Sequence, residues 1–283
     1  MKFAQAWSQC PAPALAQVCG VITDIDDTLT RDGALEPAAL AALISLQRAS
    51  LPVVAITGRP LGWSEAFMRS GPGAWPLQAI VAENGAVALI PGPGGLMIEY
   101  AQDAATRARN TQCLAAVLAR IEHEVPGARR AQDSAGRATD IAIDHSEFAQ
   151  LDASAIDQVV ALMVDAGMTA TVSSIHINGW FGQHNKLSGA RWIVQRLWGR
   201  QLDAEIERWV FVGDSTNDQL MFEAIPLSVG VANLRRFAGQ LHTWPAWITE
   251  GERGVGFAEV ANRVLATRQE IAPSPTVHPP APR

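Results

Sequence analysis

The chain has 283 residues, of which 48% are hydrophobic and 18% are charged, and its formal net charge is −6. This length and composition suffice for one large globular domain or two smaller ones. A negative net charge without a long basic run argues against nucleic acid as the main partner. An anionic substrate would therefore need a local cation or a metal ion.

The cysteines and the two ends of the chain bear on where the protein works. Cys10, Cys19 and Cys113 are too widely separated for a zinc site or a disulfide framework, so we expect free thiols in the cytoplasm. Residues 1–17 make a poor signal peptide, and no stretch approaches the roughly 18 apolar residues of a membrane span. We expect residues 1–17 to be a loose lead-in or to lie against the surface. The Pro-rich residues 271–283 have no apolar set to bury, and both terminal extensions are expected to be poorly ordered.

An acidic cluster follows the first apolar strand that the sequence predicts. The run that begins at Val21 ends in Asp24, Asp26 and Asp27. In open α/β sheets the ligand crevice lies beyond the carboxyl ends of the strands, so these acids are placed for chemistry. Taken alone, the motif is also compatible with an acidic loop that merely leaves a strand.

Two further apolar strands end in polar residues. The strand at 53–56 ends in Thr57, whose hydroxyl and backbone N–H can bind an anion, and the strand at 209–213 ends in Asp214, with Asp218 close behind. Lys186 opens an amphipathic helix between them. The helix expected from Pro37 joins the first two strands, which predicts a right-handed, parallel βαβ unit.

The spacing of these motifs predicts two domains. The interval from Asp24 to Thr57 has room for one helix, whereas the interval from Thr57 to Lys186 is far longer than a sheet connection needs. We therefore predict an α/β protein with a Rossmann-like parallel-sheet core at residues 18–90 and 180–270. An α+β cap is inserted at residues 91–179, with its first hinge in the Gly/Pro loop at 91–95.

The order of the motifs resembles that of the haloacid dehalogenase-like (HAD) superfamily of phosphohydrolases. The matching residues are Asp24, Asp26, Thr57, Lys186, Asp214 and Asp218. The cap position resembles the C2 type of subfamily IIB, which includes Cof-type, sucrose-phosphate and mannosyl-3-phosphoglycerate phosphatases. The resemblance implies a Mg²⁺-dependent phosphatase of a small phosphorylated substrate, a sugar phosphate or a glycosyl-glycerate phosphate. We expect a monomer or a homodimer.

The resemblance also implies a role for each motif residue. Asp24 would be the nucleophile that forms an aspartyl-phosphate, and Asp26 would be the general acid and base. The metal would be held by the carboxylates of Asp24 and Asp214 and by the backbone carbonyl of Asp26. Thr57 and Lys186 would bind the phosphoryl oxygens.

A second group of residues is expected around these. Arg59, Asn217 and Asp218 would contact the phosphate or support the groups that do, although an ion pair with a core acid is an equal alternative for Arg59. The candidate substrate contacts, for which structural roles also stay open, are Glu83, Asn84 and His176. Asp27, where many relatives have Gly, is interpreted as a turn residue.

Two other functions remain as alternatives to hydrolysis. A phosphosugar mutase would use the same acids but would need a bisphosphate activator. A non-catalytic sensor of sugar phosphate would bind without turnover, and the presence of Asp26 beside the nucleophile argues against it.

Overall fold

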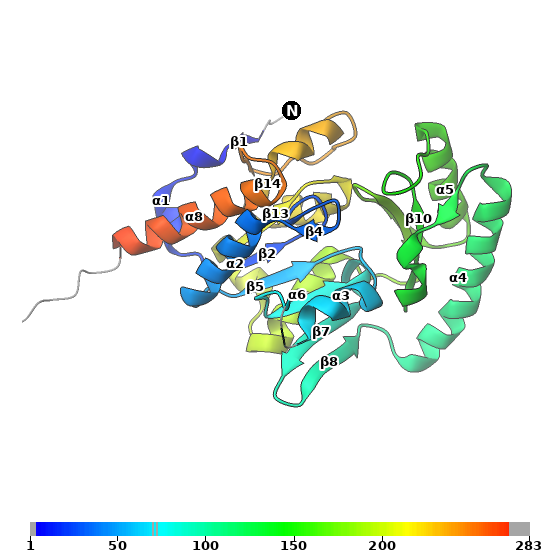
Figure 1. The fold of residues 1–283 in the computed structure, drawn as a ribbon, viewed down its shortest axis with the longest axis horizontal. Coiled ribbons are helices and arrows are strands. Elements are labelled where there is room, and N and C mark those ends of the chain that lie inside the picture. Colours follow the sequence, from blue (N-terminus) through cyan, green and yellow to red (C-terminus); the bar gives the residue numbers. More distant parts are fainter. Residues whose placement is uncertain (1–3, 70, 72, 272–283) are drawn as a thin grey trace, which may run out of the picture.

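The computed structural model describes residues 4–69, 71 and 73–271. Its core is a nine-stranded sheet, and a second, four-stranded sheet forms a separate cap (Figure 1). The core strands lie in the spatial order β1 (Gln5–Ala6), β15 (Trp247–Ile248), β14 (Leu227–Gly230), β13 (Trp209–Gly213), β2 (Gly20–Thr23), β5 (Val53–Ile56), β6 (Ala79–Ala82), β7 (Val87–Gly92) and β8 (Gly95–Tyr100). The sheet is parallel from β1 to β6, and β7 and β8 are antiparallel.

Helices cover both faces of the core sheet because its central strands are buried on both sides. One face packs against α1 (Ala12–Ala16), α2 (Pro37–Arg48), α3 (Leu61–Met68) and α8 (Arg253–Ile271). The other face packs against α6 (Lys186–Trp198) and α7 (Gln219–Ala224). The expected α/β core and the parallel pairing of β2 with β5 are confirmed.

The strand order reverses at β2. From β2 the chain moves to β5 and β6 on one side, and after the cap it returns to β13 and β14 on the other. Such a reversal leaves a crevice at the carboxyl ends of β2 and β13, because the connections that follow these two strands run in opposite directions. The polar residues that follow β2, β5 and β13 therefore meet at one place.

The cap is an α+β layer, as the sequence predicts. Its antiparallel strands lie in the order β11 (Thr169–Val172), β12 (His176–Trp180), β10 (Asp140–Asp144) and β9 (Arg129–Arg130). The helices α4 (Ala104–Glu124) and α5 (Ala153–Asp165) pack their apolar faces on this sheet, and Figure 1 shows them on the outer side of the cap. Asp103 and Asp152 cap their N-termini through backbone N–H groups.

Short elements complete the described chain. A small hairpin pairs β3 (Thr30–Arg31) with β4 (Ala34–Leu35) just after the acidic motif. The 3₁₀ helices are η1 (Trp7–Gln9), η2 (Glu83–Gly85), η3 (Gln132–Gly136), η4 (Leu202–Arg208), η5 (Thr216–Asp218) and η6 (Ala232–Phe237).

The structure places the first domain boundary later than the sequence predicts. Residues 91–95 form the tip of the β7–β8 hairpin, and β8 extends the core sheet, so the expected hinge there is wrong. The chain leaves the core between Tyr100 and the start of α4 at Ala104. Because β8 is an edge strand with no fully buried residue, it lacks the apolar pattern that marks a core strand.

The expectation of a poorly ordered amino terminus is wrong for residues 4–17. There β1 pairs with β15, and the side chains of Trp7 and Leu15 belong to the core. Two prolines in a short segment hid this packing, because they interrupt any periodic pattern. The proposed C-terminal tail lies, from residue 272 on, outside the described residues.

Glu83 joins the core to the cap. Its fully buried carboxylate accepts hydrogen bonds from the backbone N–H of Leu61 (3.0 Å) in the core and of Ala138 (2.9 Å) and Thr139 (2.6 Å) in the cap. The Thr139 hydroxyl donates to it as well. Glu83 therefore has a structural role, which is one of the two roles that the sequence left open.

Replacing Glu83 should destabilise both the core and the cap. We expect Glu83→Ala to lower the free energy of unfolding by about 3 kcal/mol or more, because buried N–H groups lose a charged acceptor. Urea unfolding measures the loss. The control is Glu99→Ala, which removes an exposed ion pair with Arg196 and should cost less than about 1 kcal/mol. Equal losses in the two variants would contradict the assignment.

Candidate functional site

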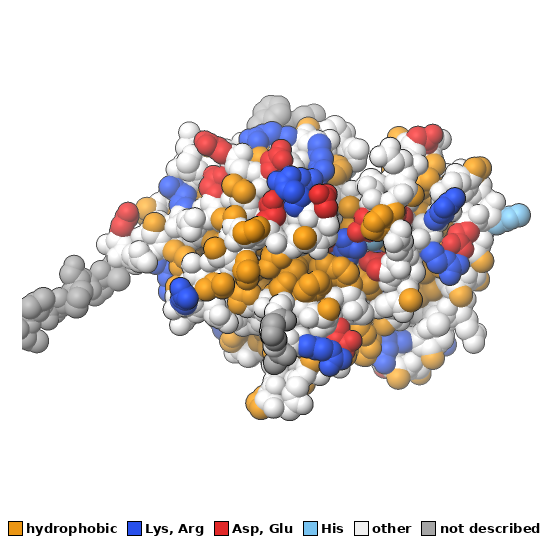
Figure 2. Space-filling view, viewed as in Figure 1, with side chains coloured by type: hydrophobic (Ala, Val, Ile, Leu, Met, Phe, Trp, Pro, Cys, Tyr) orange, Lys and Arg blue, Asp and Glu red, His pale blue; other side chains and the backbone are white. Residues whose placement is uncertain are grey.

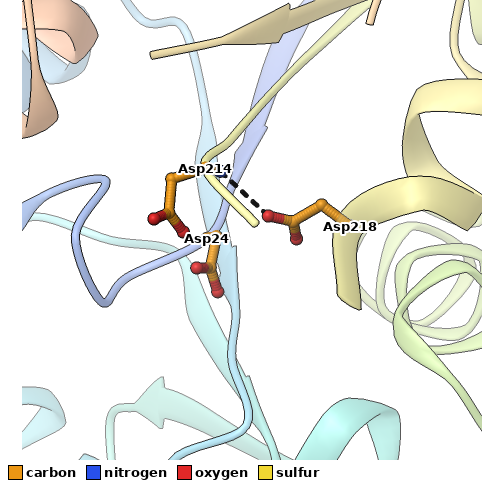
Figure 3. Close-up of side chains that lie close together, drawn as sticks. All are labelled: Asp24, Asp214 and Asp218. Atoms are coloured by element: carbon orange, nitrogen blue, oxygen red, sulfur yellow. Dashed lines mark hydrogen bonds between the residues drawn. The ribbon is translucent and has the colours of Figure 1, made fainter. Parts of the chain in front are cut away.

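The strand ends bring three carboxylates together at the reversal point. Asp24 follows β2, Asp214 follows β13 and Asp218 ends η5, and one oxygen from each lies within 4.8 Å of the others. Figure 3 shows the Asp24 and Asp214 side chains close together, with Asp218 approaching from the side. The backbone N–H of Asp24 donates to the Val212 carbonyl (2.8 Å), which holds the ends of the two strands in register.

Lys186 is the buried cation of this cluster. Its Nζ donates to Asp24 Oδ1 (2.7 Å) and to Asp218 Oδ1 (2.7 Å), and it lies 3.3 Å from Asn217 Oδ1. Burial alone would lower the pKa of Lys186, but the two aspartates raise it above its ordinary value. The ammonium is therefore charged at neutral pH.

The position of Lys186 depends on a close helix contact. Gly189, one turn into α6, packs on η2 so tightly that a Cβ there would lie 2.8 Å from the Gly85 Cα. The Asn185 side chain caps the same helix by accepting a hydrogen bond from the Ser188 N–H. Together these contacts aim the first residue of α6 at the end of β2.

The Asp218 carboxylate is fully engaged. One oxygen accepts from Lys186, and the other accepts from the backbone N–H of Asp214 (2.9 Å) and of Ser215 (3.2 Å). Its oxygens are thus less available to a metal ion than those of its neighbours. We interpret Asp218 as the residue that positions Lys186 and the loop after β13.

Asp24 and Asp214 retain unused oxygens. Asp214 Oδ1 is buried without a partner, while its other oxygen accepts from Asn233 Nδ2 (3.1 Å). Asp24 uses one oxygen for Lys186, and within the described chain its second oxygen accepts no hydrogen bond. Carboxylate oxygens of this kind are hard ligands that suit Mg²⁺.

Electrostatics favour a cation at the same place. Burial, partly offset by Lys186, raises the pKa of Asp24 to about 7. Burial and repulsion from Asp24 and Asp218 raise the pKa of Asp214 well above its ordinary value. The residues present therefore fit a divalent cation, which would stabilise the charged form of both acids.

A variant at Asp214 tests this. The raised pKa means that the charged carboxylate destabilises the folded protein at neutral pH, so without metal Asp214→Asn should be at least as stable as wild type. Wild type should gain about 2.7 kcal/mol at a Mg²⁺ concentration of 100 times Kd, and the variant should gain little. Thermal unfolding with and without Mg²⁺ measures both. The control is Asp157→Asn on the cap surface, and an undiminished Mg²⁺ effect in Asp214→Asn would contradict the site.

Arg59 connects the acid pair to the cap. Its Nε lies 3.0 Å from both carboxylate oxygens of Asp26, while its terminal nitrogens contact Glu147 (2.7 Å) and Asp133 (3.3 Å) of the cap. The guanidinium is buried, with 5% of its side chain exposed. Of the two alternatives for Arg59, the structure contains the ion pair with a core acid.

His176 supports this contact, in line with the structural role that the sequence also left open for it. Its Nε2 lies 2.9 Å from Glu147 Oε2, and the ring is buried. Burial would raise the pKa of Glu147, but hydrogen bonds with His176 and Arg59 outweigh it and lower the pKa to about 2. Glu147 therefore stays charged and anchors the cap to Arg59.

The Glu147 anchor should make stability depend on acid pH. Because its pKa falls from 4.5 in the unfolded chain to about 2 in the fold, its contribution is complete above pH 4.5 and is lost as the pH falls through about 2. The stability difference between wild type and Glu147→Gln, measured by denaturant unfolding, should shrink over that range. A difference that does not change with pH would contradict this. Glu65→Gln, at an exposed ion pair with Arg69, serves as the control.

A cavity of about 270 Å³ lies between the core and the cap, next to Asp26. Its charged lining residues are Asp26, Asp27, Asp32, Arg59, Glu147, Arg236 and Arg253. The side chains of Glu83 and Asn84 do not line it. Asn84 is buried, and its N–H donates to the carbonyl of Thr57 (2.9 Å). The Thr57 hydroxyl accepts from the Arg59 N–H (3.0 Å), so Arg59 contacts both Thr57 and Asp26.

Sequence reasoning missed a polar group on the far side of the cluster. Asn233 Nδ2 donates to Asp214 Oδ2 and to the carbonyl of Asp27 (2.9 Å), and Arg236 lies 3.4 Å from Asp214 Oδ2. These residues come from η6, beyond β14, and no local motif marks them. Only the closing of the sheet brings η6 to the end of β2.

Comparison with known proteins supports the fold. No protein-family model and no curated protein sequence matches the chain. Among solved structures, the sucrose-phosphatase of Synechocystis sp. PCC6803, in complex with sucrose and phosphate, matches with a TM-score of 0.62 and 17% identity over 88% of this chain and 98% of that one. A HAD/COF-like protein of Plasmodium vivax matches with a TM-score of 0.64 and 17% identity over 90% and 98%. The chain has the HAD hydrolase fold.

A third solved structure extends the comparison. A phosphatase of the HAD superfamily from Bacteroides thetaiotaomicron matches with a TM-score of 0.56 and 15% identity over 88% of this chain and 96% of that one. The HAD fold includes the cap inserted between the second and third motifs, so the predicted fold class is confirmed. Among the described residues, no helix combines the length and hydropathy that crossing a membrane requires.

Proposed function

We propose that this protein is a Mg²⁺-dependent phosphomonoesterase. Its substrate would be a small cytoplasmic sugar phosphate or glycosyl-glycerate phosphate, hydrolysed through an aspartyl-phosphate. The observation that carries the proposal is which hydrogen bonds the two carboxylate oxygens of Asp24 accept. One of its oxygens is held by Lys186, the other accepts no hydrogen bond in the described chain, and the unpartnered oxygen of Asp214 lies in the same cluster.

The first half of the reaction transfers the phosphoryl group to the protein. The free oxygen of Asp24 attacks phosphorus, and the bond between phosphorus and the ester oxygen breaks. Asp26, at the wall of the cavity, gives its proton to the departing alkoxide. Lys186 and the Thr57 hydroxyl bind the phosphoryl oxygens, and the charge of Lys186 offsets the negative charge that two anions bring together.

The second half releases inorganic phosphate. Asp26, now deprotonated, takes a proton from a water molecule, whose oxygen attacks phosphorus and frees the Asp24 carboxylate. A Mg²⁺ ion held by the carboxylates of Asp24 and Asp214 and the carbonyl of Asp26 would supply positive charge that reduces the repulsion between substrate and nucleophile. Arg59 orients Asp26 through hydrogen bonds to both carboxylate oxygens. Because Arg59 also contacts the cap, it fixes the position of Asp26 relative to the cap.

The similar structures and the thiols support this proposal. The Synechocystis relative binds sucrose and phosphate, and the Bacteroides relative is a phosphatase. The free state of all three cysteines is compatible with a reducing cytoplasm. A mutase or a sensor would share the fold, so turnover decides between them.

The test is phosphate release from a panel of sugar and glycosyl-glycerate phosphates with Mg²⁺. Wild type should turn over one ester class, and Asp24→Asn should lower kcat by roughly 10³-fold or more, because the nucleophile is lost. Asp203→Asn, at an exposed ion pair with Arg191, should behave as wild type. Release that needs a bisphosphate activator would indicate a mutase, and binding without release would indicate a sensor.

A further inference from the structure

Two arginines share one carboxylate at the mouth of the cavity. Arg236 donates to Asp27 Oδ2 (2.8 Å), and Arg253 donates through its Nε to Asp27 Oδ1 (2.8 Å). Figure 2 shows basic and acidic side chains gathered on this face, close to β4 and the start of α8. Arg236 also lies 3.4 Å from Asp214 Oδ2, and we call Arg236 and Arg253 the arginine pair.

The arginine pair has donors to spare. Within the described chain, the two terminal nitrogens of Arg253 donate no hydrogen bond, and Arg236 donates only through Nη2. Both residues line the cavity together with Asp26. A guanidinium with free terminal N–H groups can bind a carboxylate or a phosphate with parallel hydrogen bonds. The Arg253 side chain is 18% exposed, so it is partly shielded from water.

The other acids in the cavity wall leave the spare donors of the arginine pair free. Asp26 and Glu147 are each paired with Arg59 on the other side of the cavity. Asp32 lies on the exposed hairpin, where water screens its charge. The spare guanidinium donors thus belong to the core, since Arg236 lies in η6 and Arg253 begins α8.

The fold holds the arginine pair close to the reacting groups. Asn233 donates to the Asp27 carbonyl and to Asp214, and its Oδ1 accepts from the backbone N–H of Arg253 (2.9 Å). Asp27 and Arg253 both have positive φ, 54° and 51°, a conformation that glycine adopts more easily. Both positions nevertheless carry the side chains that form the ion pair.

We infer that the arginine pair binds a second anionic group of the substrate, a carboxylate or a second phosphate, while the ester phosphate lies at Asp24. This inference rests on the proposed function, because it assumes a phosphate ester at the nucleophile. It narrows the substrate to esters that carry another negative charge near the phosphate. A phosphate ester whose sugar carries no other charge would leave the free guanidinium donors unused.

A matched pair of probes tests the inference. In 3-phosphoglycerate a carboxylate takes the place of the hydroxymethyl group of glycerol 3-phosphate, and the phosphate ester is the same. Wild type should favour 3-phosphoglycerate by about tenfold or more in kcat/KM, which corresponds to about 1.4 kcal/mol. Arg253→Gln should bring the ratio close to one, mainly through KM. The control Arg31→Gln removes an exposed arginine outside the cavity and should keep the wild-type ratio.

A second pair identifies the anion. A preference for glucose 1,6-bisphosphate over glucose 6-phosphate that Arg253→Gln abolishes would assign the site to a phosphate, and the glycerate pair would assign it to a carboxylate. A wild-type ratio near one in both pairs, or a ratio that Arg253→Gln leaves unchanged, would overturn the inference. If Arg253→Gln does not fold, Arg253→Lys keeps the charge without the fork and should lower the ratio partway.

Binding separates this inference from the proposed function. Calorimetric titration of the same probes into Asp24→Asn with Mg²⁺ needs no turnover. Preferential binding of the doubly anionic probe, without turnover by wild type, would support the arginine pair and overturn the phosphatase. Turnover without any preference in rate or binding would support the phosphatase and overturn the inference about the arginine pair. If there is neither turnover nor preferential binding, both the phosphatase and the inference are overturned.

Discussion

Repulsion among buried carboxylates is the constraint on which this structure depends. Three aspartates meet where the strand order reverses, and only Lys186 lies among them as a buried cation in the described chain. Burial raises the pKa of Asp24 and Asp214 because neither charge is fully compensated. An arrangement of this kind is unfavourable for stability alone. A bound divalent cation would offset this repulsion, which is why the geometry supports the proposed phosphoryl transfer.

The rest of the fold buries this cluster and holds its geometry. Glu83 and Arg137 hold the cap on the core through backbone groups, since Arg137 donates to the carbonyl of Gly58 (3.0 Å) and Glu83 accepts from N–H groups of both domains. Arg59 then links the cap to Asp26, the proposed general acid. One side chain, Arg59, therefore contacts both the cap and the acid beside Asp24.

Much of this architecture could be predicted from the sequence, because local patterns encode it. Apolar strands ending in acids placed Asp24 and Asp214 at one edge of a parallel sheet, and the long interval before Lys186 predicted the inserted cap. Periodic helices with Asp caps, such as α4 and α5, were also predictable. The edge strand β8 and the packing of Trp7 were not, because neither has a periodic apolar pattern.

The side-chain partners were the least predictable part of the site. Asn233, Glu147 and Arg253 reach the crevice from distant segments, and a single sequence contains nothing that pairs them with Asp214, Arg59 and Asp27. Glu83 and His176 have the residue types of substrate contacts, but burial gave them structural partners instead. Which of two chemically suitable roles a polar residue takes depends on its three-dimensional neighbours.

The central claim is that Asp24 carries the phosphoryl group during turnover. The most direct measurement is rapid acid quenching of Asp26→Asn with Mg²⁺ and an aryl phosphate ester, whose phenolate leaves without a proton from Asp26, followed by mass spectrometric mapping of the phosphorylated peptide. Without its general base the protein should accumulate an aspartyl-phosphate on Asp24. Phosphate release with no phosphorylated protein at any time, or a phosphoryl group on Asp214 in place of Asp24, would contradict the account.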